Sequence, residues 1–247
     1  MKNITTITSI VASLALGGSV FAGTTSGKGV AVAEVAPVSP FSTNLTVGYS
    51  STYEYRGVEI GDNLFNADLT TTYKVNDQVS IYAGAWYGTL WDGDYNELDL
   101  TGGATYDFGP VTLGALYRYY FYDADFGDNN EVGLLLATKD WNGLVFGLGG
   151  YYDFEFDGFY FELGGSYSHK FNDMVGVKLS TGVSYQMDYT VDGDGFNHVF
   201  VQADLPIAIA KNVTLTPFIK GVFPIDALDS AGADDLVLGG ASLTVTF

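Results

Sequence analysis

Charged side chains recur at alternate positions along several stretches of this chain, with apolar residues between them. Glu97 and Asp99, for example, alternate with Leu98 and Leu100. Side chains with this spacing share one face of a β-strand, where they can line a water-filled path or pair with one another. The face assigned in this way carries Glu54, Arg56, Asp68, Glu97, Asp99, Arg118, Asp153, Glu155, Glu162, Lys178, Asp188, His198, Asp204 and Lys220.

The chemistry of this face depends on whether water reaches it. Carboxylates outnumber cationic groups in the set, so a hydrated lining predicts a mild preference for cations. In the alternative, the same charges pair with one another inside a plugged interior and conduct nothing. Arg56 and Arg118 would then be neutralised by acidic neighbours such as Glu54 and Glu162.

Groups suited to catalysis are sparse. The chain has two histidines and no cysteine, which excludes thiolate metal sites. His169 follows Ser168 directly, so the two side chains of a strand would point to opposite faces. His198 is expected roughly opposite Asp188, but no serine nucleophile is evident beside this pair. We therefore predict no enzymatic activity and no cofactor, with a hydrolase as the least favoured alternative.

Acidic residues also gather between the alternating stretches. The segments 123–128 and 192–195 offer oxygen ligands that suit Ca²⁺, but neither has the twelve-residue spacing of an EF-hand. Solvated loops beside lipopolysaccharide bridged by divalent cations are the simpler interpretation. The whole chain has 29 acidic and 10 basic residues and a net charge of −19. Such a chain repels phosphate backbones, so nucleic acid is not an expected partner.

The elements that must position these side chains are long strands. Apolar residues recur at every second position from Ser42 to Phe247, and most of the segments are 10 to 14 residues long. Strands of soluble proteins cluster near 5–6 residues, whereas strands that cross a membrane need about 9–11. The predicted strands are 43–55, 63–74, 79–91, 96–108, 110–122, 131–140, 143–155, 159–171, 175–188, 197–209, 212–223 and 236–247.

The connections between these segments alternate in kind. Tight turns such as 108–110 and 210–212 alternate with more acidic and mostly longer loops such as 57–63 and 224–235, as in outer-membrane barrels. A sheet survives in hydrocarbon only by closing on itself. We therefore predict an all-β, transmembrane antiparallel β-barrel of twelve strands, with ten or fourteen as alternatives. Strand length argues against a soluble sandwich or lipocalin-like barrel. Aromatic residues near strand ends, Tyr53 and Tyr55 among them, are expected at the membrane interfaces.

The two ends of the chain predict an outer-membrane location. Residues 1–22 have the pattern of a secretory signal peptide, residues 23–41 form a flexible periplasmic leader, and residues 42–247 form the barrel. The final strand ends at Phe247, a feature that the barrel-insertion machinery of Gram-negative-type bacteria reads. The expected partners are this machinery, outer-membrane lipid and lipopolysaccharide.

Two short motifs in the N-terminal half carry a family resemblance. Tyr55-Arg56-Gly57 closes an alternating strand, and Tyr82-Ala83-Gly84-Ala85-Trp86 lies in a later one. This arrangement resembles the TorF-like porin family of outer-membrane β-barrels. The resemblance implies a porin-like barrel and supplies no substrate. Together with the polar face, it favours a narrow channel for passive passage of small hydrophilic solutes. The alternative is a closed structural or adhesive barrel without transport.

Overall fold

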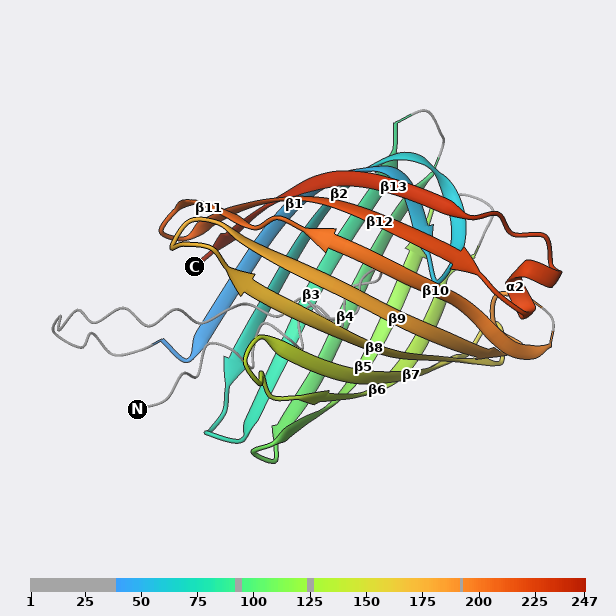
Figure 1. The fold of residues 1–247 in the computed structure, drawn as a ribbon. Helices are drawn as coiled ribbons and strands as arrows, with labels where there is room; N and C mark the ends of the chain where they lie inside the picture. The colour runs from blue at the N-terminus through green and yellow to red at the C-terminus, as the bar shows by residue number, and fades with distance from the viewer. Residues whose placement is uncertain (1–38, 92–94, 124–126, 192) are drawn as a thin grey trace, which may run out of the picture.

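The protein, described by a computed structural model, is a closed β-barrel (Figure 1). The structure describes residues 39–91, 95–123, 127–191 and 193–247. The predicted signal peptide, nearly all of the leader, and parts of both acidic segments considered for Ca²⁺ lie outside the described residues. Within these ranges, no helix is long and apolar enough to cross a membrane.

Thirteen strands form one antiparallel sheet, in which each strand except at the β10–β11 junction pairs with its neighbour in the chain and β1 also pairs with β13. An additional pairing between β10 and β12 closes the sheet. The strands are β1 (Phe41–Tyr55), β2 (Val58–Lys74), β3 (Val79–Leu90), β4 (Asn96–Asp107), β5 (Val111–Tyr122), β6 (Asn129–Thr138), β7 (Leu144–Asp153), β8 (Gly158–Lys170), β9 (Gly176–Met187), β10 (Asp194–Asp204), β11 (Ile207–Ala210), β12 (Val213–Pro224) and β13 (Leu236–Thr246). The short helix α2 (Ala227–Ser230) lies between β12 and β13.

The thirteenth strand arises from a break rather than from an extra crossing. The predicted segment 197–209 is divided into β10 and β11 at Leu205-Pro206. Proline has no N–H to give to a neighbouring strand, so it interrupts the ladder. Beyond it, β11 pairs with β12, and Ile207 still bridges Val175 beside β9. The wall therefore has the twelve antiparallel crossings that the sequence predicts, and the fold class is confirmed.

The start of β1 and the end of β13 lie at the same end of the molecule, here called the terminal end. Phe247 N–H donates to the Thr43 carbonyl across 2.8 Å, and the tight turns lie at this end (Figure 1). The other connections and α2 lie at the opposite end, here called the loop end. The alternation of turns and loops is as predicted, with one exception at the first connection.

That exception is the junction of β1 and β2. The sequence predicts a loop over 57–63, but β1 and β2 are joined by the two residues Arg56 and Gly57 alone. Their φ angles of 52° and 88° are both positive, as in the turns that match the twist of a hairpin. The strands are consequently 15 and 17 residues long, the longest of the sheet, and their tip bends inward at the loop end (Figure 1).

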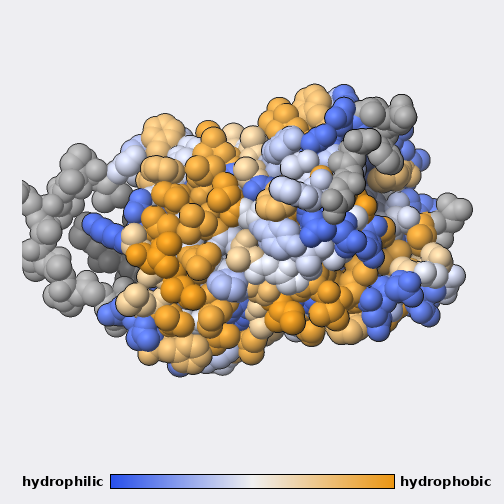
Figure 2. Space-filling model, turned by 90° about the horizontal axis from the view of Figure 1, so that it is seen from above, coloured by the Kyte–Doolittle hydropathy of each residue, from blue (hydrophilic) through white to orange (hydrophobic). Residues whose placement is uncertain are grey.

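The two faces of the wall differ as a membrane barrel requires. Large apolar side chains such as Leu69, Leu134 and Phe146 are exposed on the outside, while hydroxyl and charged groups such as Thr101 and Arg118 are buried inside. Figure 2 shows hydrophobic residues over much of one side of the wall, with hydrophilic residues gathered mainly toward its ends. This is the reverse of a soluble barrel, whose core is apolar.

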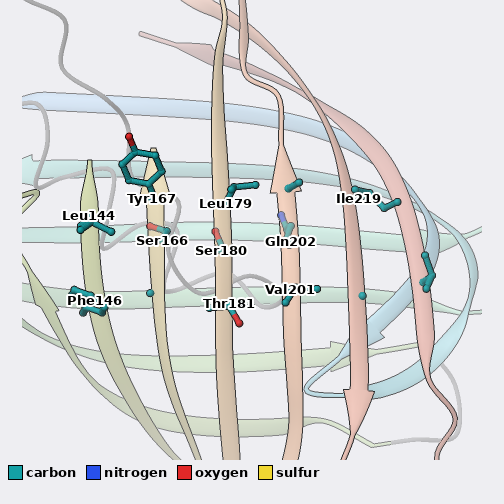
Figure 3. A pocket seen from close by; sticks show the side chains of 14 residues that line it. Leu144, Phe146, Ser166, Tyr167, Leu179, Ser180, Thr181, Val201, Gln202 and Ile219 are labelled. Carbon is teal, nitrogen blue, oxygen red and sulfur yellow. The ribbon is translucent and has the colours of Figure 1, made fainter. Parts of the chain in front are cut away.

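An open apolar groove of about 650 Å³ lies on this outer surface, across β7, β8, β9, β10, β12 and β13. Leu144, Phe146, Leu179, Val201 and Ile219 line it, and Figure 3 shows them on adjacent strands. Its lining is nearly all carbon, so the groove faces lipid and is not part of a path for hydrophilic solutes.

We expect an outward charge at mid-wall to destabilise the barrel strongly. Leu134 lies at the middle of β6 and is 63% exposed, so Leu134→Arg places a guanidinium in hydrocarbon and lowers the free energy of unfolding by about 2–4 kcal/mol. Trp141→Arg is the control, because Trp141 is 71% exposed in the turn after β6 and a charge near the interface costs only about 0–1 kcal/mol. Urea titration in phospholipid vesicles measures both. Equal losses would contradict the assignment of the outer face.

Candidate functional site in the barrel lumen

The tip of the first hairpin lies across the barrel lumen at the loop end. We call residues Tyr53–Gly57 the hairpin plug. The Tyr53 hydroxyl donates to Glu97 Oε2 on β4 across 2.6 Å. The Tyr55 hydroxyl lies 2.7 Å from the Tyr120 hydroxyl on β5. Because the plug also reaches β6, β7, β8, β10 and β12, as described below, it fills the cross-section of the barrel at this level.

A β-bulge explains why these tyrosines lie inside. The pairing of β1 with β2 shifts register between Tyr53 and Glu54, where Ile60 is an extra residue on β2. Such a bulge bends the strand that carries it, and the hairpin tip turns into the lumen, where both faces of β1 meet protein. Tyr53 and Glu54 are consequently both buried although they are adjacent. The prediction that Tyr53 and Tyr55 lie at the membrane interface is therefore wrong.

At the tip of the plug, Arg56 forms part of a buried charge cluster. Arg56 Nη1 lies 2.9 Å from Glu131 Oε2, and Arg118 Nη1 lies 3.2 Å from Glu131 Oε1. All three side chains are at most 8% exposed, and that of Glu131 is fully buried. One carboxylate on β6 therefore holds a guanidinium from the plug and another from β5.

Four tyrosine rings surround the same guanidinium. The Arg56 Cζ lies 5.0 Å from the ring centroid of Tyr55, 4.4 Å from that of Tyr151, 4.6 Å from that of Tyr160 and 4.8 Å from that of Tyr189. These distances lie within the range of cation–π attraction. We call the four rings the aromatic cage. Burial raises the pKa of Tyr189, which lies in the turn after β9, to about 12, so its phenol stays neutral at physiological pH.

A second ion pair holds the other side of the plug. Lys220 Nζ on β12 lies 2.5 Å from Glu54 Oε2, while Glu54 Oε1 accepts the Gly57 N–H at 2.7 Å. A Cβ added at Gly57 would lie 2.6 Å from His198 Nδ1 and 2.7 Å from Leu228 Cδ1. Only glycine fits there, both for this close approach and for its positive φ.

The structure brings most of the predicted site residues to the lumen. Asp68 and Asp204 are half-buried. Two of the predicted residues, Glu54 and Arg56, belong to the plug, and Lys220 contacts it. The predicted residues that are buried inside the barrel are Glu54, Arg56, Glu97, Asp99, Arg118, Asp153, Glu162, Lys178, His198 and Lys220.

Glu155 and Asp188 lie elsewhere, in exposed turns at the loop end. The predicted strands 143–155 and 175–188 extend too far, because β7 ends at Asp153 and β9 at Met187. Asp153 ends its strand by accepting the N–H groups of Glu155 and Phe156 at 2.9 and 3.0 Å. Asp188 similarly accepts the Gly193 N–H at 2.7 Å and does not pair with His198.

A serine that the sequence reasoning did not find lies beside His198. Ser184 Oγ is 2.9 Å from His198 Nδ1, and Asn197 Oδ1 is 2.7 Å from the same nitrogen. A catalytic histidine holds its nucleophile and its orienting acid on different ring nitrogens, whereas both contacts here use Nδ1. Ser184 is also fully buried on β9. The geometry is that of a structural hydrogen-bond network that packs against the plug.

The lumen is more open toward the terminal end. The inward positions of β1, β12 and β13, including Thr46, Thr216 and Ser242, are partly exposed. Some buried carboxylate oxygens accept no hydrogen bond from any described protein group, among them Asp68 Oδ2 and Asp99 Oδ1. Such oxygens are the ones that water or a cation solvates. The described interior thus combines charged and hydroxyl groups with apolar clusters, and it is closed at the level of the plug.

Three solved structures of outer-membrane proteins share this architecture. The chain matches the KdgM porin with a TM-score of 0.53 and 10% identity, over 83% of this chain and 99% of that one. It matches an outer-membrane channel from Pseudomonas putida F1 with a TM-score of 0.53 and 12% identity, over 87% and 97% of the two chains. It matches the NanC porin with a TM-score of 0.52 and 12% identity, over 83% and 98%. No protein-family model and no curated protein matches the chain in sequence.

These likenesses establish the fold. The chain is an all-β barrel of the kind found among outer-membrane porins and channels. Because the identities are near 10%, the chemistry of the lumen has to be argued from this chain's own residues.

The sequence reasoning missed Glu131 and the tyrosines of the cage. Glu131 had an available signal, since it alternates with the outward-facing Val132 and Leu134 on β6. The tyrosines had a weaker one. Tyr151 and Tyr160 are apolar enough to suit lipid and polar enough to suit the lumen, and only their strand register decides between the two.

Proposed function

We propose that the protein is an outer-membrane channel for passive passage of small hydrophilic solutes with a mild preference for cations. The observation that carries this proposal is a closed barrel of twelve crossings whose outer wall is apolar and whose interior buries many charged and hydroxyl side chains besides its apolar clusters. The fold shared with the KdgM and NanC porins supports it, and so does the sequence resemblance to TorF-like porins.

The proposed channel is closed in the conformation described. The plug bridges the lumen between Glu131 on one side and Lys220 on the other, so conduction requires that the hairpin move. Eight-stranded barrels are filled by side chains and barrels of 16–18 strands leave an open channel. A barrel of twelve lies between these sizes, and a single inward hairpin is enough to close it.

A closed structural barrel is the second candidate, because two buried ion pairs anchor the plug. The contacts proposed for either function are with outer-membrane lipid and lipopolysaccharide around the wall, and with the insertion machinery through the strand that ends at Phe247. Among the described residues of the lumen, no arrangement favours a hydrolase over these two candidates.

Planar-bilayer recording tests the proposal. Protein purified from bacterial outer membranes is expected to give small, infrequent conductance steps in KCl, with a reversal potential under a salt gradient that indicates preferential passage of K⁺. The physical reason is the excess of carboxylates over cationic groups in the lumen. If neither the wild type nor a variant with a shortened hairpin conducts, the structural barrel is the correct function.

A further inference from the structure

The aromatic cage is largely built by the barrel wall and not by the plug. Tyr151 lies on β7, Tyr160 on β8 and Tyr189 in the turn after β9, while Tyr55 is the one cage ring that the hairpin supplies. Glu131 is on β6. Withdrawal of the plug would therefore leave three rings and a carboxylate in place around the position that the Arg56 guanidinium now occupies.

The vacated position would have a net negative environment. Arg118 would still neutralise Glu131 in part, through its contact of 3.2 Å. Asp153, however, is the direct cross-strand partner of Glu131, so a second carboxylate on β7 lies beside it. The excess of carboxylates at this level disfavours an anion and favours a cation.

The contacts of Arg56 indicate the shape of the cation that fits. Its two terminal nitrogens approach the two Glu131 oxygens: Nη2 donates to Oε1 at 3.2 Å, and Nη1 lies 2.9 Å from Oε2 as an ion-pair contact. A flat cation with two N–H-bearing groups side by side matches this approach. Nη1 also donates to the Tyr189 hydroxyl. The surrounding ring faces attract a weakly hydrated organic cation more than a small, strongly hydrated metal ion.

We propose that the aromatic cage with Glu131 is a binding site for small organic cations of the guanidinium or ammonium class, and that Arg56 occupies it as an internal ligand in the closed barrel. The inference rests on the proposed channel function for its biological meaning, since it names the class of solute that would compete with the plug. The site itself depends only on the geometry of the lumen.

Binding of methylguanidinium to an Arg56→Ala variant tests the site. The substitution removes the internal ligand and leaves the rest of the plug. In detergent micelles, methylguanidinium at ten times its dissociation constant is expected to raise the Tm of Arg56→Ala by about 3–5 °C and that of the wild type by much less. Methylurea, which has nearly the same shape and no charge, is the matched control and is expected to have no effect on the variant.

Two further variants make the result specific. Arg56→Ala with Glu131→Gln, and Arg56→Ala with Tyr160→Leu, are each expected to lose most of the methylguanidinium effect, because one removes the carboxylate and the other a cage ring. If methylguanidinium and methylurea act alike, or if the double variants respond as fully as Arg56→Ala, the proposed site is wrong.

A variant that removes the plug covers the case in which Arg56→Ala does not fold. Replacing residues 53–61 with Asn-Gly leaves Tyr151, Tyr160, Tyr189 and Glu131 in the wall, and methylguanidinium should stabilise it more weakly because Tyr55 is lost. These measurements do not depend on conductance. Binding without any channel activity would disprove the proposed channel function and support the binding site. Conduction without binding would support the channel function and disprove the binding site.

Discussion

Replacing Glu131 with glutamine is expected to lower the free energy of unfolding by about 3–5 kcal/mol, the loss typical of a buried ion pair that loses one partner. Glu131 is fully buried and is the carboxylate that both Arg56 and Arg118 contact. Glutamine keeps the size and one acceptor oxygen but removes the carboxylate that lies within ion-pair distance of both buried guanidinium groups. Urea titration of the reconstituted protein, followed by tyrosine fluorescence, measures the loss.

The matched control is Glu59→Gln, because Glu59 lies on the same hairpin and is exposed on β2. Its removal is expected to change stability by no more than about 0.5 kcal/mol. Combining Glu131→Gln with Arg56→Met removes one of the unpaired charges and should restore part of the stability, so the two substitutions will not be additive. A loss at Glu131 no larger than that at Glu59 would show that the cluster contributes little to the closed barrel.

The barrel itself could be predicted because one physical rule governs almost every wall position. A strand with lipid on one side and the lumen on the other must alternate, and the alternation of Leu98 and Leu100 with Glu97 and Asp99 places only the two leucines outside. The exact ends of strands are less constrained, since near the rim both faces meet water. This is why the alternation extends two predicted strands to Glu155 and Asp188, whereas the observed strands end before these residues.

The inward plug could not be predicted in the same way. Arg56 and Glu131 are separated by 75 residues, and nothing local in the sequence indicates that they meet. The hairpin bends at the bulge opposite Tyr53 and Glu54, and both of these side chains are buried in the lumen, so simple alternation fails there. A partial signal did exist, because Gly57 between two alternating segments suits the second position of a two-residue hairpin turn.

Removing the plug is expected to increase the single-channel conductance several-fold over the wild type. Thr52 and Asp62 are paired across the hairpin, so replacing residues 53–61 by Asn-Gly rejoins the strands through a turn of suitable twist. The variant removes the rings of Tyr53 and Tyr55 and the charges of Glu54 and Arg56 from the lumen. Water can then enter and solvate Glu131 and Lys220, so the loss of their partners is less destabilising than in a dry interior.

The size of this increase distinguishes a closed gate from an ordinary loop. Ile60→Ser, which keeps the length of the hairpin and alters an exposed position of β2, should conduct as the wild type does. Cation preference should persist in the shortened variant, because the lumen loses one charge of each sign, Glu54 and Arg56, while Glu97, Asp99 and Glu131 stay on the wall. If the shortened hairpin leaves the conductance unchanged, the plug does not control the path, and the closure lies in the packed layer of Tyr82, Leu116 and Leu135 beyond it.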